Sequence, residues 1–482
     1  MNWPAILFIL GIEMLAFGFA MTLPALFSLG HNDAEWIAFL TSALLVIFIG
    51  GNLTLMNRGR TQVLGHRDGF MLTVLTWTVL GTLGALPFWL SSHAPTLVDA
   101  IFESISGLTS TGATVLSGLD TMGHGVLFWR ALLQWLGGMG IIVLAVAVLP
   151  FLRVGGLQLY KSEFAGVVKD KLQPRLQETA KLLWGVYVLL TSICALAYYI
   201  AGMNAFDAIC HAFTTVATGG FANYDASFAA FENPAIEWIA IVFMLIGGTS
   251  FALHYVFLTK NNIRTYLENE EFKFYLSIVA SAVALVTLGL VLTDQFNGTD
   301  ALRKSAFQVV SLMTTTGYAS ADYSAWHVFS PMIILVLIFI GGCSGSTSGG
   351  MKAMRVLMIA KQSGREMYNL LHPSGVSHVK IGKRTVPDNI MQAVWSFAGI
   401  FIICYIIIAL LLAAHGLDLV TAFSAAAATI TCAGPGLGDV GPASNYASLP
   451  ATAKLICCFA MLLGRLEVFT LLLVFNPQFW RR

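Results

Sequence analysis

Long apolar stretches separated by short polar connections dominate the chain. Ten of them reach or approach the roughly 20 residues that a helix needs to cross a bilayer. They fall near residues 4–29, 36–56, 69–90, 126–152, 182–201, 235–258, 274–293, 332–360, 390–414 and 452–475. This pattern predicts an all-α polytopic membrane protein, and an even number of crossings puts both ends of the chain on one side.

Composition agrees with this prediction. Of 482 residues, 57% are apolar and 11% charged, against about 25% charged in soluble domains. A cytosolic enzyme, a disordered protein and a nucleic-acid-binding protein are therefore excluded. The seven cysteines show no paired ligand spacing, which argues against a disulfide framework or a zinc site. The apolar N-terminus lacks a basic region and a cleavage site, so we expect a retained span.

The charges are strongly segregated between the two faces. On the ten-span topology, 21 of the 26 Lys and Arg residues lie on one face, and Arg465 lies within a span. This bias predicts that both termini are cytoplasmic. The other face has 14 acidic residues, which would concentrate cations. Its four basic residues are Arg130, Arg303, Lys304 and Lys454.

Four shorter apolar segments on the outer side resemble one another. They span 101–113, 209–221, 306–319 and 422–436, and each lies between two full spans. Each later span carries glycine again, at Gly137-Gly138, Gly247-Gly248, Gly341-Gly342 and Gly464. Aligned by glycine, the segments read Ser110-Thr111-Gly112-Ala113, Ala217-Thr218-Gly219-Gly220, Thr315-Thr316-Gly317-Tyr318 and Cys432-Ala433-Gly434-Pro435.

This repetition predicts four pseudo-repeats of M1–pore loop–M2 around a central pore, after two extra N-terminal transmembrane helices. The expected units are an N-terminal helix pair (1–66) and pore repeats at 67–172, 173–265, 266–384 and 385–482.

Non-helical backbone at membrane depth is tolerated where it lines a water-filled path. Glycine allows backbone dihedrals that let consecutive carbonyls point inward, and a ring of carbonyl oxygens from four loops can replace the hydration shell of a monovalent cation. The residues before each glycine would form a short helix with its partly negative end at the pore. The expected K⁺-binding residues are Thr111, Gly112, Thr218, Gly219, Thr316, Gly317, Ala433 and Gly434.

Thr-Gly loops on a fourfold repeat resemble the Trk, Ktr and HKT superfamily of potassium transport proteins. The Gly/Ser-rich stretch 341–352, and Gly464-Arg465-Leu466-Glu467 with the later Asn476-Pro477, are most similar to its Trk-type potassium uptake proteins. The resemblance implies K⁺ uptake across the bacterial inner membrane, and Gly112 favours K⁺ because relatives with serine there lean toward Na⁺. The fourth loop departs from many relatives, which carry asparagine before Gly-Pro-Gly.

The stretch 341–350 interrupts an apolar span. It nearly matches a phosphate-binding loop, but Met351 separates the last glycine from Lys352, so nucleotide binding is disfavoured. The resemblance implies instead a gating loop below the filter, with Gly345, Gly349 and Gly350 as its candidate gate residues. Arg465, central in the last span, would raise the barrier for cations from within the pore. The alternative is a structural ion pair with Glu13 or another acidic group.

The remaining residues do not predict an enzyme. His211 and His254 have no second ligand nearby and are interpreted as structural. No cofactor is expected, with K⁺ as the substrate. A channel and a symporter coupled to H⁺ or Na⁺ stay open as alternatives. The resemblance implies a homodimer docked on a cytosolic nucleotide-binding subunit. The basic segment 352–387, including Lys361, Arg365, Lys380 and Lys383, is expected to couple this subunit to the gating loop.

Overall fold

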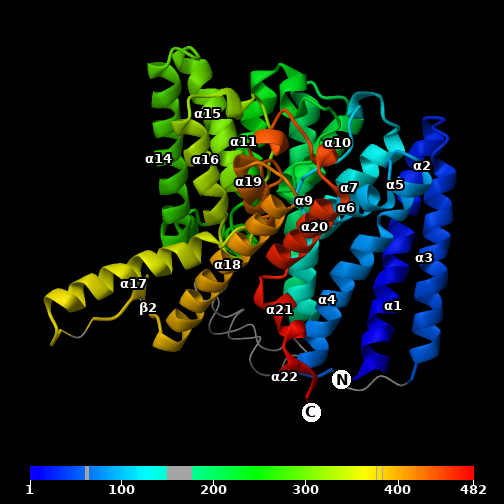
Figure 1. Cartoon of the computed structure of the whole chain (residues 1–482), viewed down its shortest axis with the longest axis horizontal. Coiled ribbons are helices and arrows are strands. Elements are labelled where there is room, and N and C mark those ends of the chain that lie inside the picture. Colours follow the sequence, from blue (N-terminus) through cyan, green and yellow to red (C-terminus); the bar gives the residue numbers. More distant parts are fainter. Residues whose placement is uncertain (60–63, 149–175, 376, 383, 482) are drawn as a thin grey trace.

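The computed structural model describes residues 1–59, 64–148, 176–375, 377–382 and 384–481, which form a predominantly helical bundle (Figure 1). The first half contains α1 (Trp3–Ala20), α2 (Thr22–Gly30), α3 (Trp36–Asn57), α4 (His66–Leu83), α5 (Leu86–Leu90), α6 (Leu97–Leu108), η1 (Leu119–Thr121), α7 (His124–Val148), α9 (Leu176–Ile200), α10 (Ala205–Val216) and η2 (Ser227–Phe231).

The second half begins with α11 (Pro234–Gly247), α12 (Phe251–Lys260), α13 (Arg264–Leu267), α14 (Glu270–Leu292), α15 (Gly298–Met313), η3 (Tyr323–Ala325), α16 (Phe329–Ile340) and α17 (Ala353–Leu371). The strands β1 (Lys380–Ile381) and β2 (Arg384–Thr385) pair antiparallel, Lys380 with Thr385. The chain ends with α18 (Asp388–Ala414), α19 (Leu419–Ile430), η4 (Gly438–Val440), η5 (Tyr446–Ser448), α20 (Ala451–Arg465), α21 (Phe469–Phe475) and α22 (Pro477–Trp480).

Helices able to cross a membrane are confirmed. Within the described residues, six stretches have the length and apolar composition of a span: Trp3–Gly30, Trp36–Asn57, Arg67–Leu90, Ala180–Ile200, Glu270–Leu292 and Asp388–Ala414. Counting each of two bent helix pairs as one span makes eight. The end of the expected span 126–152 lies outside the described residues.

The spans expected at 235–258 and 452–475 are broken helices. Helices α11 and α12 meet at 95°, and α20 and α21 meet at 114°. The first break follows from a tertiary contact, because the Gly248 carbonyl accepts a hydrogen bond from Cys343 N at 2.8 Å. At the second break, Glu467 and Val468 have φ of 56° and 47°, which no helix accommodates.

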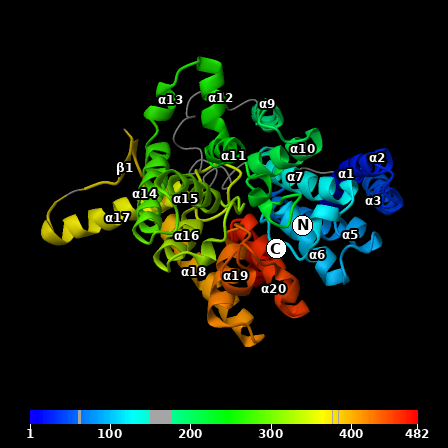
Figure 2. The same ribbon diagram turned by 90° about the horizontal axis from the view of Figure 1, so that it is seen from above.

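The span expected at 332–360 is interrupted, as the Gly/Ser-rich stretch indicated. Helix α16 ends at Ile340, a loop follows, and α17 starts at Ala353. Figures 1 and 2 show α17 projecting away from the bundle beside the small hairpin. The expected apolar span extended too far, to residue 360. Its last part belongs to α17, which is amphipathic and continues to Leu371.

The four expected short helices are present as α6, α10, α15 and α19. Figure 2 shows them on different sides of the centre of the molecule. Each begins three to eight residues before its apolar stretch. The Thr96 hydroxyl caps α6 by accepting from Asp99 N at 3.1 Å, and Asn204 caps α10 by accepting from Asp207 N at 2.8 Å. Such caps satisfy amide groups that an N-terminus leaves unpaired.

These short helices are deeply buried despite their hydroxyl groups. In α19 every residue from Ser424 to Ile430 is buried. Threonines at the helix ends donate to the carbonyl four residues earlier, each at 2.7 Å: Thr109 to Ile105, Thr314 to Val310 and Thr431 to Ala427. These threonine hydroxyls are therefore satisfied within their own helices, whereas the buried Ser104 and Ser106 hydroxyls of α6 have no hydrogen-bond partner among the described residues. The N- and C-termini lie at the same end of the molecule (Figure 1).

Candidate functional site

Each short helix ends in a turn of the same conformation. We call residues 109–113, 217–221, 314–318 and 431–435 the first to fourth ring loops. Each loop has a residue of positive φ and then, two positions later, a glycine of positive φ. The pairs are Ser110 (54°) and Gly112 (84°), Thr218 (49°) and Gly220 (82°), Thr315 (55°) and Gly317 (84°), and Cys432 (55°) and Gly434 (89°).

The structure corrects the alignment of the second loop by one residue. Gly220, not Gly219, has the positive φ that Gly112 has. The hydrogen bonds agree, since Thr111 N donates to Ser106 O at 2.9 Å and Gly219 N to Thr214 O at 2.8 Å. Gly219 therefore corresponds to Thr111, Thr316 and Ala433. The sequence could not decide which of the two adjacent glycines aligns with Gly112, because either can adopt the conformation.

The four loops close into a ring. A Cβ added to Gly112 would overlap Gly219 O, and one added to Gly220 would overlap Thr316 O. One added to Gly317 would overlap Ala433 O, and one on Gly434 would lie 2.7 Å from Thr111 O. Each glycine thus adjoins a carbonyl oxygen of the next loop, and the fourth adjoins the first. Glycine is required at these positions for two reasons: the positive φ and the close approach of the neighbouring carbonyl oxygen.

The glycines of the later spans lie against the ends of the short helices. A Cβ on Gly137 would overlap Leu108 O, and one on Gly464 would overlap Ile430 O. A Cβ on Gly247 would lie 3.1 Å from Val216 O. Leu108, Val216 and Ile430 are the last residues of α6, α10 and α19. These glycines therefore let a long helix approach a short helix through backbone contact, whereas Gly341 packs within its own loop.

The loop at 341–352 is bonded to three of the four ring loops or their helices. Gly350 N donates to Thr431 O at 3.0 Å, and Gly349 N donates to the Thr315 hydroxyl at 2.6 Å. The Thr347 hydroxyl donates to Val216 O at 3.0 Å, at the end of α10. The loop therefore lies directly against the helix ends from which the ring loops start.

Arg465 is buried, with 4% of its surface exposed, and bonds to backbone oxygens. Its Nη1 donates to Thr347 O at 2.9 Å, and its Nη2 donates to Gly137 O at 2.7 Å. Within the described residues it forms no ion pair. The alternative partner Glu13 accepts instead from the Thr76 hydroxyl at 2.6 Å. Arg465 thus connects α7 with the 341–352 loop.

Two further charged residues, Lys352 and Glu271, hold the 341–352 loop, and their sequence context did not indicate this role. The Lys352 ammonium donates to Ser346 O and Ser348 O, on either side of the carbonyl that Arg465 holds. One oxygen of Glu271 accepts from Ser344 N at 2.6 Å and Met354 N at 3.1 Å. In the sequence Glu271 resembles an ordinary acidic residue in the first turn of a helix.

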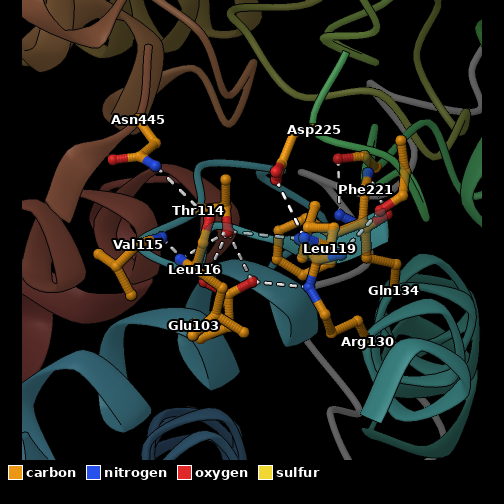
Figure 3. A network of polar contacts seen from close by, with 12 residues as sticks. Glu103, Thr114, Val115, Leu116, Leu119, Arg130, Gln134, Phe221, Asp225 and Asn445 are labelled. Carbon is orange, nitrogen blue, oxygen red and sulfur yellow. Dashed lines mark hydrogen bonds and ion pairs between the residues drawn. The ribbon is translucent and has the colours of Figure 1, made fainter. Parts of the chain in front are cut away.

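The four basic residues expected on the outer face are all in ion pairs. Arg130 pairs with Glu103 at 2.8 Å, and both side chains are almost fully buried (Figure 3). Lys304 and Arg303 pair with Glu237 at 2.8 and 3.6 Å, and Lys454 pairs with Asp99 at 2.6 Å.

Three of these cations also donate to a backbone carbonyl in the segment that follows a ring loop. Arg130 donates to Ala222 O at 2.7 Å, Lys304 to Ser320 O at 2.9 Å and Lys454 to Ala447 O at 2.9 Å. The outer cations therefore stabilise the protein interior.

The two histidines in apolar context have structural contacts. His211 Nδ1 lies 2.8 Å from Asp207 O, and His254 Nε2 lies 2.9 Å from Ile246 O. The remaining ring nitrogen of His254 lies 2.7 Å from the Tyr266 hydroxyl. Both rings therefore satisfy buried polar groups, in line with the structural interpretation.

A closed ring of backbone carbonyls, buried inside a bundle of apolar helices, is an arrangement suited to binding a cation within a membrane protein. Comparison with known families agrees, since residues 37–482 match the family model TrkH, described as cation transport protein. The chain belongs to the TrkH family of cation transport proteins, and its relatives are named as transporters rather than enzymes.

The relatives match over the full length. The "Trk system potassium uptake protein TrkH" of Halomonas elongata is 46% identical, with 100% of each chain covered. The protein of the same name from Escherichia coli K12 is 45% identical, again over 100% of each chain. The crystal structure of the potassium transporter TrkH from Vibrio parahaemolyticus matches with a TM-score of 0.92 and 40% identity, covering 100% of both chains.

Proposed function

We propose that this protein takes up K⁺ across the bacterial inner membrane, through a selectivity filter built from the carbonyls of the four ring loops. The closed ring of glycine–carbonyl contacts between Gly112, Gly220, Gly317, Gly434 and the neighbouring loops carries this proposal. Carbonyl oxygens suit a monovalent cation, and the ring loops contain no carboxylate that a divalent site would require. The potassium uptake named for the relatives supports the same substrate.

In this proposal the chain is divided as the repetition suggested. Helices α1 to α3 form the N-terminal pair of spans, within 1–66. Pore repeats follow at 67–172, 173–265, 266–384 and 385–482, each with one of α6, α10, α15 and α19 between two other helices. The expected cation ligands Thr111, Thr218, Gly219, Thr316 and Ala433 lie in the ring loops, next to the glycines.

The 341–352 loop and Arg465 form the gate in this proposal. The carbonyls of Ser346, Thr347 and Ser348 are each bonded to a cationic side chain, either Lys352 or Arg465. These carbonyls face cations of the protein instead of K⁺, and two positive charges beside the path oppose ion passage. Opening requires that the loop, with Gly345, Gly349 and Gly350, moves away from the helix ends.

A homodimer with a cytosolic nucleotide-binding subunit would control this gate, with both termini in the cytoplasm. Helix α17 supports the coupling because it follows the loop directly and projects from the bundle (Figure 1). Some of its basic residues already have partners, since Lys361 pairs with Glu270 and Arg365 pairs with Asp388 at 3.0 Å. Lys383 and much of the basic run 152–181 lie outside the described residues.

The experiment is a flux measurement on the purified protein in proteoliposomes. K⁺ gradients should drive flux that Na⁺ gradients do not, and Gly112→Ala or Gly317→Ala should reduce this preference. Equal K⁺ and Na⁺ flux in the wild-type protein would refute the filter. The reversal potential under opposed K⁺ and H⁺ gradients, or opposed K⁺ and Na⁺ gradients, distinguishes a channel from the coupled symporter.

A further inference from the structure

The side chain of Gln134 forms two hydrogen bonds with the second ring loop. Gln134 lies on α7, in the first unit, and is fully buried. Its Nε2 donates to Gly219 O at 2.6 Å, and its Oε1 accepts from Phe221 N at 3.0 Å (Figure 3). Both ends of the amide are used, which fixes its orientation. The bond to Gly219 O is shorter than the usual amide–carbonyl distance.

Gly219 O is one of the four ring carbonyls. It is the oxygen that a Cβ on Gly112 would overlap, and its counterparts are Thr316 O, Ala433 O and Thr111 O. Gln134 therefore reaches a proposed cation ligand from the protein side. A carbonyl that accepts a short hydrogen bond is held in place, and the positive amide hydrogen offsets part of the negative field that its oxygen presents to a cation.

Two other units carry methionine at the position equivalent to Gln134. Gln134 precedes Gly137 by three residues, and Met244 and Met461 precede Gly247 and Gly464 by three. A second contact confirms the register, because the Ser110 hydroxyl donates to Gln134 O and the Cys432 thiol donates to Met461 O. Both methionines are fully buried. Of these three equivalent positions, 134 is the one with a hydrogen-bond donor.

We propose that Gln134 is a positioning residue that tunes the cation preference of the ring by holding the Gly219 carbonyl. The inference rests on the proposed function. Releasing this carbonyl increases its mobility and its field strength, and a stronger field favours the smaller cation, Na⁺. The ring is therefore asymmetric, with one carbonyl restrained by a side chain of the neighbouring unit.

The test compares Gln134→Met, which copies the second and fourth units, with the matched control Met461→Leu. Both keep an apolar or nearly isosteric side chain. In proteoliposomes, the K⁺ over Na⁺ flux ratio should fall about fivefold in Gln134→Met, the factor expected from one lost neutral hydrogen bond. The ratio should stay unchanged in Met461→Leu. A flux ratio reports on folded protein, so reduced yield alone does not change it.

A second variant and a second readout cover the case in which Gln134→Met fails to fold. Gln134→Leu offers no donor to Gly219 O, so its ratio should fall as well. The rise in melting temperature caused by K⁺, relative to Na⁺, should shrink in parallel because binding stabilises the folded state.

An unchanged ratio in folded Gln134→Met or Gln134→Leu would overturn the inference, as would an equal fall in Met461→Leu. A wild-type protein without K⁺ preference would instead refute the proposed function.

Discussion

Gly220→Ala is the sharpest test of the ring, because the sequence alone selected Gly219 as the key glycine of the second loop. The alanine Cβ would overlap Thr316 O and lie 2.9 Å from the Thr316 carbonyl carbon. Carbon atoms prefer separations of about 3.5–4.0 Å, so the carbonyl has to retreat by about 0.6 Å or more. Functional geometry tolerates displacements of about 0.5 Å. The K⁺ over Na⁺ preference should therefore fall by about tenfold, or 1.4 kcal/mol.

Gly118→Ala is the matched control for this prediction. Gly118 has a φ of 75°, close to the 82° of Gly220, but nothing lies within 4 Å of its Cβ position. Both variants incur about 1–2 kcal/mol of left-handed strain, which lowers stability, whereas the clash with the ring occurs in Gly220→Ala alone.

The assay is the reversal potential of reconstituted protein between K⁺ and Na⁺, with thermal unfolding in detergent alongside. Equal selectivity in the wild-type protein and a folded Gly220→Ala variant would refute the ring. A loss of selectivity in Gly118→Ala would show that backbone strain, and not the carbonyl contact, is the cause.

Three further predictions address the gate and the buried charges. Arg465→Ala should raise K⁺ flux through the otherwise closed protein, because it removes a positive charge and the bond to Thr347 O; reduced flux with misfolding, measured by size-exclusion chromatography, would favour a structural role. Shortening the loop within 343–349 should give flux insensitive to the nucleotide-binding partner, and retained nucleotide-dependent gating would count against the loop as the gate. Glu103→Gln should destabilise the protein by about 3–5 kcal/mol, because Arg130 is then left buried without its carboxylate; denaturant unfolding measures this, and a melting curve like that of the wild type would contradict it.

Much of the architecture was predictable from local sequence. Apolar stretches near 20 residues indicated the long helices, and shorter apolar segments that end in glycine turns indicated the short ones. Arg465 was notable for its charge within an apolar span. These signals depend on a residue and its near neighbours, since hydropathy, capping and the left-handed preference of glycine act over one or two helical turns.

Tertiary contacts decided the rest. Gly219 and Gly220 are equally able to adopt positive φ, and the hydrogen bond from Gly219 N to Thr214 O decides which of them adjoins the third loop. The breaks after α11 and α20 follow from a partner of the Gly248 carbonyl and from left-handed residues, which hydropathy does not register.

The sequence did not indicate the partners of the charged residues either, because these are also tertiary contacts. Arg130 and Glu103 were expected on the outer face with no indication of a partner, yet the fold removes both from water and pairs them. The sequence by itself determined which segments are apolar enough to enter a membrane, because the cost of hydrating or burying each residue is local. Only the tertiary structure decided which carbonyl Arg130, Gln134 and Arg465 reach, because their hydrogen bonds to Ala222, Gly219 and Gly137 join residues 85 to 328 positions apart in the chain.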